Sequence, residues 1–145
     1  MNSFLQKLSK KWREGKFVCI GLDDGRFDFN KSIIDATGDL VCAYKPNSAF
    51  YEAEGMKGRK ALEQTVEYIK TNHPDIPIIL DAKRGDIGNT NEGYVKDVFD
   101  NLGVGAVTVH PYLGKEALMP FLDRADRGIF VLVKTSNPGA AEFQD

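Results

Sequence analysis

The sequence lacks the long apolar runs, the basic charge and the leader segment that would assign it to a membrane or to nucleic acid. Its 145 residues contain no apolar run near the roughly 18 residues that a membrane span requires. Residues 1–7 lack the apolar core of a signal peptide. Lysine and arginine number 19 against 21 aspartates and glutamates, so the formal net charge is −2 and no basic field is available for nucleic acid. We therefore expect a cytoplasmic protein that binds neither membranes nor nucleic acid.

Cysteine and cofactor-binding loops are also scarce. Cys19 and Cys42 are the two cysteines, and both lie in apolar, strand-like runs, which predicts reduced core residues and no disulfide or catalytic role. The sequence contains no Gly-x-Gly-x-x-Gly or Walker-type loop, so folds built around a nucleotide cofactor lose support. A hydrophobic content of 42% is sufficient for one globular unit.

Short β-branched apolar runs alternate with longer amphipathic segments along the whole chain. This alternation predicts repeated βα units around a parallel sheet. Each apolar run is nearly continuous, as expected for a strand covered on both faces. The five predicted strands are 17–23, 40–46, 76–83, 106–110 and 128–134.

The segments between these strands include three predicted helices, 3–14, 57–71 and 91–102. Apolar residues recur in each at the spacing of one helix face. In the first helix that face carries Phe4, Leu5, Leu8 and Trp12.

Each predicted strand ends in polar residues. Asp23, Lys45 and His110 end the first, second and fourth strands, charged residues end the third, and residues 135–137 follow the fifth. Polar side chains that converge from the carboxyl ends of several parallel strands are typical of an active site, both in barrels and in open parallel sheets. The rhythm of strands and helices alone does not separate these two architectures.

The end of the third strand has the densest chemistry. Asp81 and Lys83 are two residues apart and so share one face of a strand, and Gly85 allows a turn that would bring Asp86 back towards them. A lysine between two carboxylates stays protonated and suits a proton donor in a polarised site. The alternative is that Lys83 and Arg84 merely neutralise two surface aspartates at a strand end, which contributes little to stability.

The segment 80–90 reads LDAKRGDIGNT and closely resembles the signature of the orotidine 5'-phosphate decarboxylase family. The segment 135–139, TSNPG, resembles the longer bacterial branch of that family. The resemblance implies an α/β fold of the (β/α)8 TIM-barrel class. Such a barrel takes about 250 residues, so we expect residues 1–145 to form a single partial barrel domain of about the first five βα units. Strands six to eight, with the glutamine and arginine that grip the substrate phosphate in the family, would be absent.

The resemblance also implies roles for individual residues. Lys83 would be the proton donor, Asp81 would lie beside the substrate carboxylate, and Lys45 would belong to the same charge network. Asp86 would reach across a homodimer interface into the neighbouring site. The implied substrate-binding residues are Asp23 at the ribose, Ser136 at the pyrimidine edge, and Ile87 and Thr90, which would accompany Asp86 across the interface.

The implied reaction converts orotidine 5'-monophosphate to UMP and CO2 in de novo pyrimidine biosynthesis, with no metal and no organic cofactor. One alternative is an inactive half-barrel fragment or a binding module. Another is a magnesium-dependent sugar-phosphate decarboxylase of the same superfamily, which resembles this pattern at the third strand. Lys45 argues against that alternative, because it puts a cation where a metal site needs an anion. A Schiff-base aldolase is also disfavoured, because flanking aspartates do not lower the pKa of a lysine.

Overall fold

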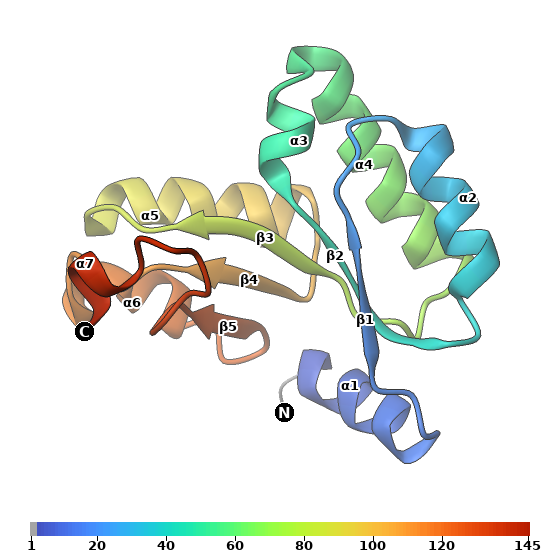
Figure 1. The fold of residues 1–145 in the computed structure, drawn as a ribbon, viewed down its shortest axis with the longest axis horizontal. Helices are drawn as coiled ribbons and strands as arrows, with labels where there is room; N and C mark the ends of the chain where they lie inside the picture. Colours follow the sequence, from blue (N-terminus) through green and yellow to red (C-terminus); the bar gives the residue numbers. More distant parts are fainter. Residues whose placement is uncertain (1–2) are drawn as a thin grey trace.

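A computed structural model describes residues 3–145 and shows parallel strands alternating with helices (Figure 1). In this part of the chain a π-helical segment, η1, directly continues helix α5. The elements, in chain order, are α1 Ser3–Arg13, β1 Val18–Leu22, α2 Phe27–Thr37, β2 Val41–Pro46, α3 Ser48–Glu52, α4 Gly55–Asn72, β3 Ile79–Arg84, α5 Gly88–Val95, η1 Lys96–Asn101, β4 Ala106–Val109, α6 Lys115–Leu122, β5 Gly128–Val131 and α7 Ala141–Gln144.

The strands follow one another in space in the order in which they occur in the chain. β1 pairs with β2, and β3, β4 and β5 pair in that order, all in parallel. The isolated bridges Tyr44↔Ile78 and Asn47↔Asp81 join the two groups between β2 and β3. A doubly wound sheet reverses its strand order at a switch point, whereas a (β/α)8 barrel adds each strand beside the last. The observed order β1-β2-β3-β4-β5 is therefore that of a barrel.

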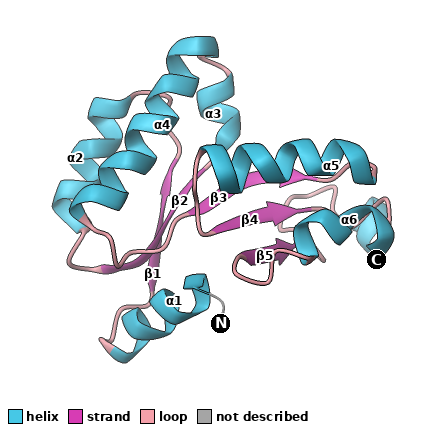
Figure 2. Ribbon diagram, turned by 180° about the vertical axis from the view of Figure 1, so that it is seen from behind, coloured by secondary structure: helices cyan, strands magenta, loops and turns pink. Residues whose placement is uncertain are grey.

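The main core lies between the outer face of the sheet and its helices. Figures 1 and 2 show α2 and α4 side by side against β1 and β2, while α5 runs along β3. Tyr44, Leu80 and Val107 point from successive strands into this core, and all three are at most 1% exposed. Successive residues of a strand point to opposite faces of the sheet. The residues that alternate with these core residues therefore lie on the other face, which is the inner face of the barrel.

Helix α1 covers the amino-terminal end of that opposite, inner face. Phe4 and Leu8 form a separate buried cluster with Ala43, Ile79 and Ala106. The Phe4 ring lies so close to Gly128 that a Cβ atom there would come within 2.6 Å of it. Two residues further along each strand, the inner face carries Lys45, Asp81 and Thr108 instead of apolar side chains.

Several predicted boundaries and burial patterns are wrong. The third strand begins at Ile79 instead of residue 76, because Pro77 has no amide hydrogen to donate to a ladder. Strands β1 and β5 are edge strands with several exposed residues, so they are not covered on both faces. For the same reason Cys19 is exposed, whereas Cys42 is buried as predicted.

Helix boundaries also differ from the predicted ones. Leu5 and Trp12 are 52% and 44% exposed, so the buried face of α1 is narrower than its apolar pattern. The predicted helix 91–102 begins at Gly88 and changes to π-helix at Lys96. Helices α2, α3, α6 and α7 were not among the predicted elements.

Candidate active site at the carboxyl ends of the strands

Asp81 is the centre of the candidate site. Its carboxylate is buried, and both of its oxygens accept hydrogen bonds. Oδ2 accepts from Lys45 Nζ at 2.8 Å, and Oδ1 accepts from Lys83 Nζ at 2.6 Å and from Thr108 Oγ1 at 2.9 Å. We refer to Lys45, Asp81, Lys83 and Thr108 as the Asp81 cluster.

Three neighbouring strands contribute to the Asp81 cluster. Lys45 lies near the end of β2, Asp81 and Lys83 lie in β3, and Thr108 lies in β4. Each of them follows an apolar inward-facing residue by two positions, or by four in the case of Lys83. The alternation of the strands therefore brings these side chains together above the small apolar layer that α1 covers.

The charges of the Asp81 cluster stabilise one another. Burial raises the pKa of Asp81, but the hydrogen bonds from Lys45, Lys83 and Thr108 outweigh burial and lower the pKa from 3.8 to about 2. The hydrogen bond to Asp81 raises the pKa of Lys45 despite partial burial. Both groups are therefore charged at neutral pH.

The Lys83 ammonium is held by the Asp81 carboxylate but remains accessible to a ligand. Its side chain is 50% exposed, compared with 8% for the side chain of Asp81. Lys83 is also the only non-glycine residue between Ser3 and Asp145 with a positive φ, 46°. This conformation costs about 1–2 kcal/mol in an ordinary residue. The Asp81 carboxylate is buried, and the ammonium that it binds is accessible and belongs to a residue with a strained backbone. This arrangement differs from two exposed aspartates neutralised at a surface, so that alternative does not describe the site.

Asp86 does not lie against Lys83 as its spacing predicted. Among the described residues Lys83 forms an ion pair with Asp81 and not with Asp86. The Asp86 carboxylate instead accepts the amide hydrogen of Ile87 at 2.7 Å, and Asn91 bonds both backbone polar groups of Asp86. The turn at Gly85 therefore leads Asp86 into the start of α5. Its predicted contact with a second subunit stays a prediction.

The four residues predicted to bind substrate lie on accessible surface at or beyond the strand ends. Asp23 directly follows the last pair of β1 and β2, Leu22 with Pro46, and its charge adds to the causes that raise the pKa of Lys45. Ser136 is exposed in the segment after β5. Ile87 is 57% exposed, and Thr90 is exposed in the first turn of α5.

Two further residues support the end of β3. Thr108 was not among the predicted site residues, although a polar residue between two valines is a signal in the sequence. In the structure Val107 and Val109 are both fully buried. His110 packs its ring on Gly85, where a Cβ atom would lie 2.6 Å from His110 Nε2. The backbone amide of His110 also donates to the Arg84 carbonyl at 2.9 Å.

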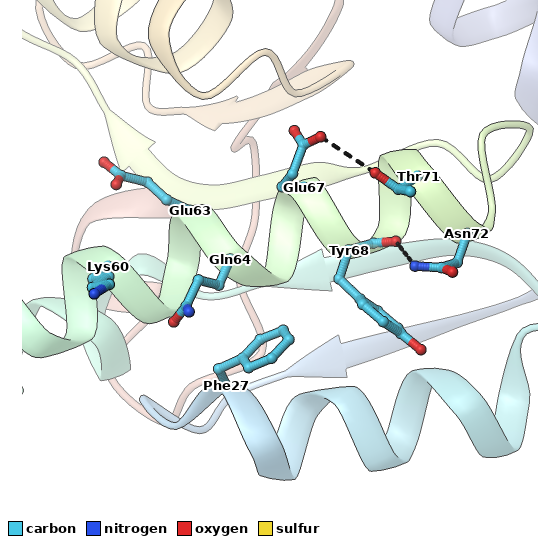
Figure 3. Close-up of a pocket in the computed structure, with 8 residues that line it drawn as sticks. All are labelled: Phe27, Lys60, Glu63, Gln64, Glu67, Tyr68, Thr71 and Asn72. Carbon is cyan, nitrogen blue, oxygen red and sulfur yellow. Dashed lines mark hydrogen bonds between the residues drawn. The ribbon is translucent and has the colours of Figure 1, made fainter.

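A second concave surface lies on the outer side of the molecule, between α2 and α4. Figure 3 shows Phe27 and Tyr68 facing each other across it, with Lys60, Glu63 and Gln64 along α4. The two rings meet edge to face, with centroids 5.9 Å apart. No residue of the Asp81 cluster lines this groove, so we place the candidate site at the strand ends on the basis of its chemistry.

Fold and site together define a class: a (β/α) barrel protein with a charged centre at the carboxyl ends of its strands. Residues 16–145 match the model of the "Orotidine 5'-phosphate decarboxylase / HUMPS family", and the chain belongs to this family. It is 50% identical to an orotidine 5'-phosphate decarboxylase from Roseiflexus castenholzii over 100% of this chain and 57% of that protein. The corresponding enzyme from Thermomicrobium roseum is 51% identical over 99% and 55%.

Solved structures agree with this family and with the predicted fold class. The structure of Leishmania donovani OMP decarboxylase superposes with a TM-score of 0.92 at 36% identity, covering 98% of this chain and 58% of that one. The chain thus spans about half the length of the curated relatives that it matches, and about half of the barrel.

The described residues contain neither a membrane-spanning helix nor a cluster of metal ligands. No helix between Ser3 and Asp145 combines the length and the apolar character needed to cross a membrane. Within the same residues, no three histidine, cysteine or acidic side chains gather in an arrangement that could hold a metal ion.

Proposed function

We propose that this chain carries the catalytic centre for the decarboxylation of orotidine 5'-monophosphate to UMP and CO2. The observation that carries the proposal is the fixed ammonium of Lys83, 2.6 Å from a buried, ionised Asp81 that Lys45 holds from the other side. We further infer that residues 1–145 form one partial barrel domain and that the reaction uses no metal and no organic cofactor.

The chemistry requires a cation where a carbanion forms. The bond between the pyrimidine ring and its carboxylate breaks, CO2 leaves, and the electron pair remains on the ring carbon. A preorganised ammonium stabilises this charge more in the transition state than in the ground state. Lys83 then delivers a proton to the same carbon, and Asp81 keeps the lysine oriented and protonated until that step.

The remaining predicted residues would complete the substrate site. Asp23 would contact the ribose and Ser136 the pyrimidine edge. Asp86, Ile87 and Thr90 would enter the neighbouring site of a homodimer, and the exposure of Ile87 and Thr90 is consistent with such a contact. These roles rest on the family.

The Asp81 cluster also weighs against a magnesium-dependent sugar-phosphate decarboxylase. Both oxygens of Asp81 already accept hydrogen bonds, from two lysines and a threonine. A magnesium site needs oxygen ligands that are free to coordinate, and the ammonium of Lys45 occupies the position next to the carboxylate.

The test is a turnover assay on two proteins. One is this chain, and the other is this chain continued by the carboxyl half of the Roseiflexus castenholzii relative. Turnover is followed by the absorbance change of orotidine 5'-monophosphate, with and without a chelator. We expect the continued chain to be active in both conditions and Lys83→Ala to lower its kcat by at least about 100-fold. Lys57→Ala, an exposed lysine of α4, is the matched control and should leave kcat unchanged.

Each outcome decides one alternative. A folded continued chain without turnover, or one that Lys83→Ala leaves fully active, would overturn the proposal. Loss of this turnover with the chelator would contradict a reaction that uses no metal. Activity in the continued chain but not in the 145-residue chain would identify the latter as an inactive fragment of the enzyme.

A further inference from the structure

Thr108 has an unusual position for a threonine in a buried strand. Its neighbours Val107 and Val109 point into the outer core and are fully buried, whereas Thr108 faces inward beside Asp81. β5 pairs with the edge of β4 that faces away from β3, and there the residue paired with Thr108 is Phe130. Thr108 is the only polar residue of β4. On the inner face it lies in the same layer as Asp81 and Lys45.

The Thr108 hydroxyl uses all of its hydrogen-bonding capacity on β3. It donates its proton to Asp81 Oδ1 at 2.9 Å. It accepts the backbone amide of Ala82 at 3.1 Å and that of Lys83 at 2.9 Å. A hydroxyl has one proton and two lone pairs, so this group is saturated by three consecutive residues of the neighbouring strand.

These bonds fall where the sheet is irregular. The pairing of β3 with β4 is regular at Ile79 and Leu80 and then shifts before it resumes at Arg84. Inside the shifted stretch Lys83 has its φ of 46°. A backbone in this region persists only where its surroundings determine it, and the Thr108 hydroxyl binds the amide of that same residue.

We propose that Thr108 is a positioning residue that sets the backbone of Lys83 and the orientation of Asp81 at the same time. It does not contact the reacting atoms. Its hydroxyl holds the irregular stretch of β3 in the conformation that aims the Lys83 ammonium back at Asp81, with the ammonium still open to the substrate side. The catalytic consequence rests on the proposed decarboxylase function, whereas the backbone consequence does not.

The experiment compares three variants. Thr108→Val keeps the shape and removes the hydroxyl, Thr108→Ser keeps the hydroxyl, and Thr65→Val is the matched control. Thr65 is a fully buried threonine of α4 whose hydroxyl donates to the Ala61 carbonyl within the same helix, apart from the Asp81 cluster. Kinetics are measured on the chain continued by the relative's carboxyl half, and amide hydrogen exchange by NMR on the 145-residue chain.

We expect Thr108→Val to lower kcat by about 10- to 100-fold with a much smaller change in KM, the loss expected for a hydrogen bond to a charged group. Thr108→Ser should restore kcat to within about threefold, and Thr65→Val should leave kcat unchanged even where it lowers stability. In the exchange experiment the amides of Ala82 and Lys83 should be protected in the unsubstituted chain and in Thr108→Ser, and should exchange faster in Thr108→Val.

The two readouts separate failure of this proposal from failure of the proposed function. An inactive continued chain with protected Ala82 and Lys83 amides would remove the decarboxylase assignment and leave the positioning role intact. An active enzyme that Thr108→Val does not slow would overturn the catalytic role of Thr108. Unprotected Ala82 and Lys83 amides in the unsubstituted chain would overturn the positioning role even if Thr108→Val does not fold.

Discussion

Asp81 makes the stability of the folded chain depend on pH. Its pKa is lowered to about 2 from an ordinary value of 3.8, so the folded state favours the ionised carboxylate. This contribution to stability is fully present above the unfolded pKa of 3.8 and is lost as the pH falls through the folded pKa near 2. We expect the free energy of unfolding to fall by about 2 kcal/mol more in the unsubstituted chain than in Asp81→Asn between pH 6 and pH 2.

Urea unfolding followed by circular dichroism at a series of pH values would measure this difference. Asp39→Asn changes an exposed aspartate in the turn before β2 and should keep the pH dependence of the unsubstituted chain. Identical pH profiles for Asp81→Asn and the unsubstituted chain would contradict the lowered pKa of Asp81.

The residues of the site differ in how far the sequence could predict them. Asp81 and Lys83 follow from a charged strand end, because residues two apart share a face, and the structure joins them. Lys45 follows from the pattern of polar strand ends, but its place in the charge network with Asp81 came from the family resemblance, since nothing in the spacing links β2 to β3. Thr108 was missed because threonine is a common strand residue. The position of Asp86 could not be predicted, because it depends on the path of the turn after Gly85. The His110 ring, from a different strand end, packs on Gly85.

At the scale of elements, α1 packs on the inner face of the sheet through Phe4 and Leu8, and Phe4 is the larger of the two. Phe4 is 5% exposed, packs with Ala43, Ile79 and Ala106, and meets Phe130 edge to face with centroids 5.8 Å apart. Phe4→Ala should lower the free energy of unfolding by about 3 kcal/mol or more, because a cavity replaces the ring. It should also speed amide hydrogen exchange throughout α1.

Leu5→Ala serves as the control for this helix. Leu5 is 52% exposed and is the next residue along the chain, so its truncation should cost less than about 1 kcal/mol. Comparable losses for the two substitutions in chemical denaturation would show that α1 is not held chiefly through Phe4.

The elements that the sequence missed are those whose stability comes mainly from packing. α3 has only five residues, and α6 contains Pro120 in its interior, so neither presents a long periodic pattern. α2 begins at Phe27, directly beside the charged residues Asp24, Arg26 and Asp28 that follow β1. Local periodicity is a weak guide in such segments, because tertiary packing stabilises short helices more than propensity does.

At the scale of the whole molecule, the alternation of strands and helices left two architectures open. The family resemblance predicted the barrel, and the strand order confirms it. Alternating strands and helices are common to barrels and doubly wound sheets. The choice depends on which strands are neighbours, and no local pattern encodes long-range pairing. In the structure the bridges of Tyr44 with Ile78 and of Asn47 with Asp81 supply this information, because they set β3 beside β2.

The two edges of the sheet lead to a prediction about the 145-residue chain in solution. β1 and β5 each pair on one side in the described structure. Val18 in β1 and Val133, two residues beyond the end of β5, are 57% and 83% exposed. Open apolar edges template pairing with another chain, and a net charge of only −2 offers little repulsion. We expect the weight-average mass in sedimentation equilibrium to rise with concentration. Val18→Lys and Val133→Lys together should weaken the association by at least about tenfold, or about 1.4 kcal/mol.

Met56→Lys, at a 92% exposed position of α4, is the control and should not weaken the association. Equal weakening by Met56→Lys would mean that the surface in general, and not the strand edges, drives the association, and a mass that stays monomeric at every concentration would contradict the prediction outright.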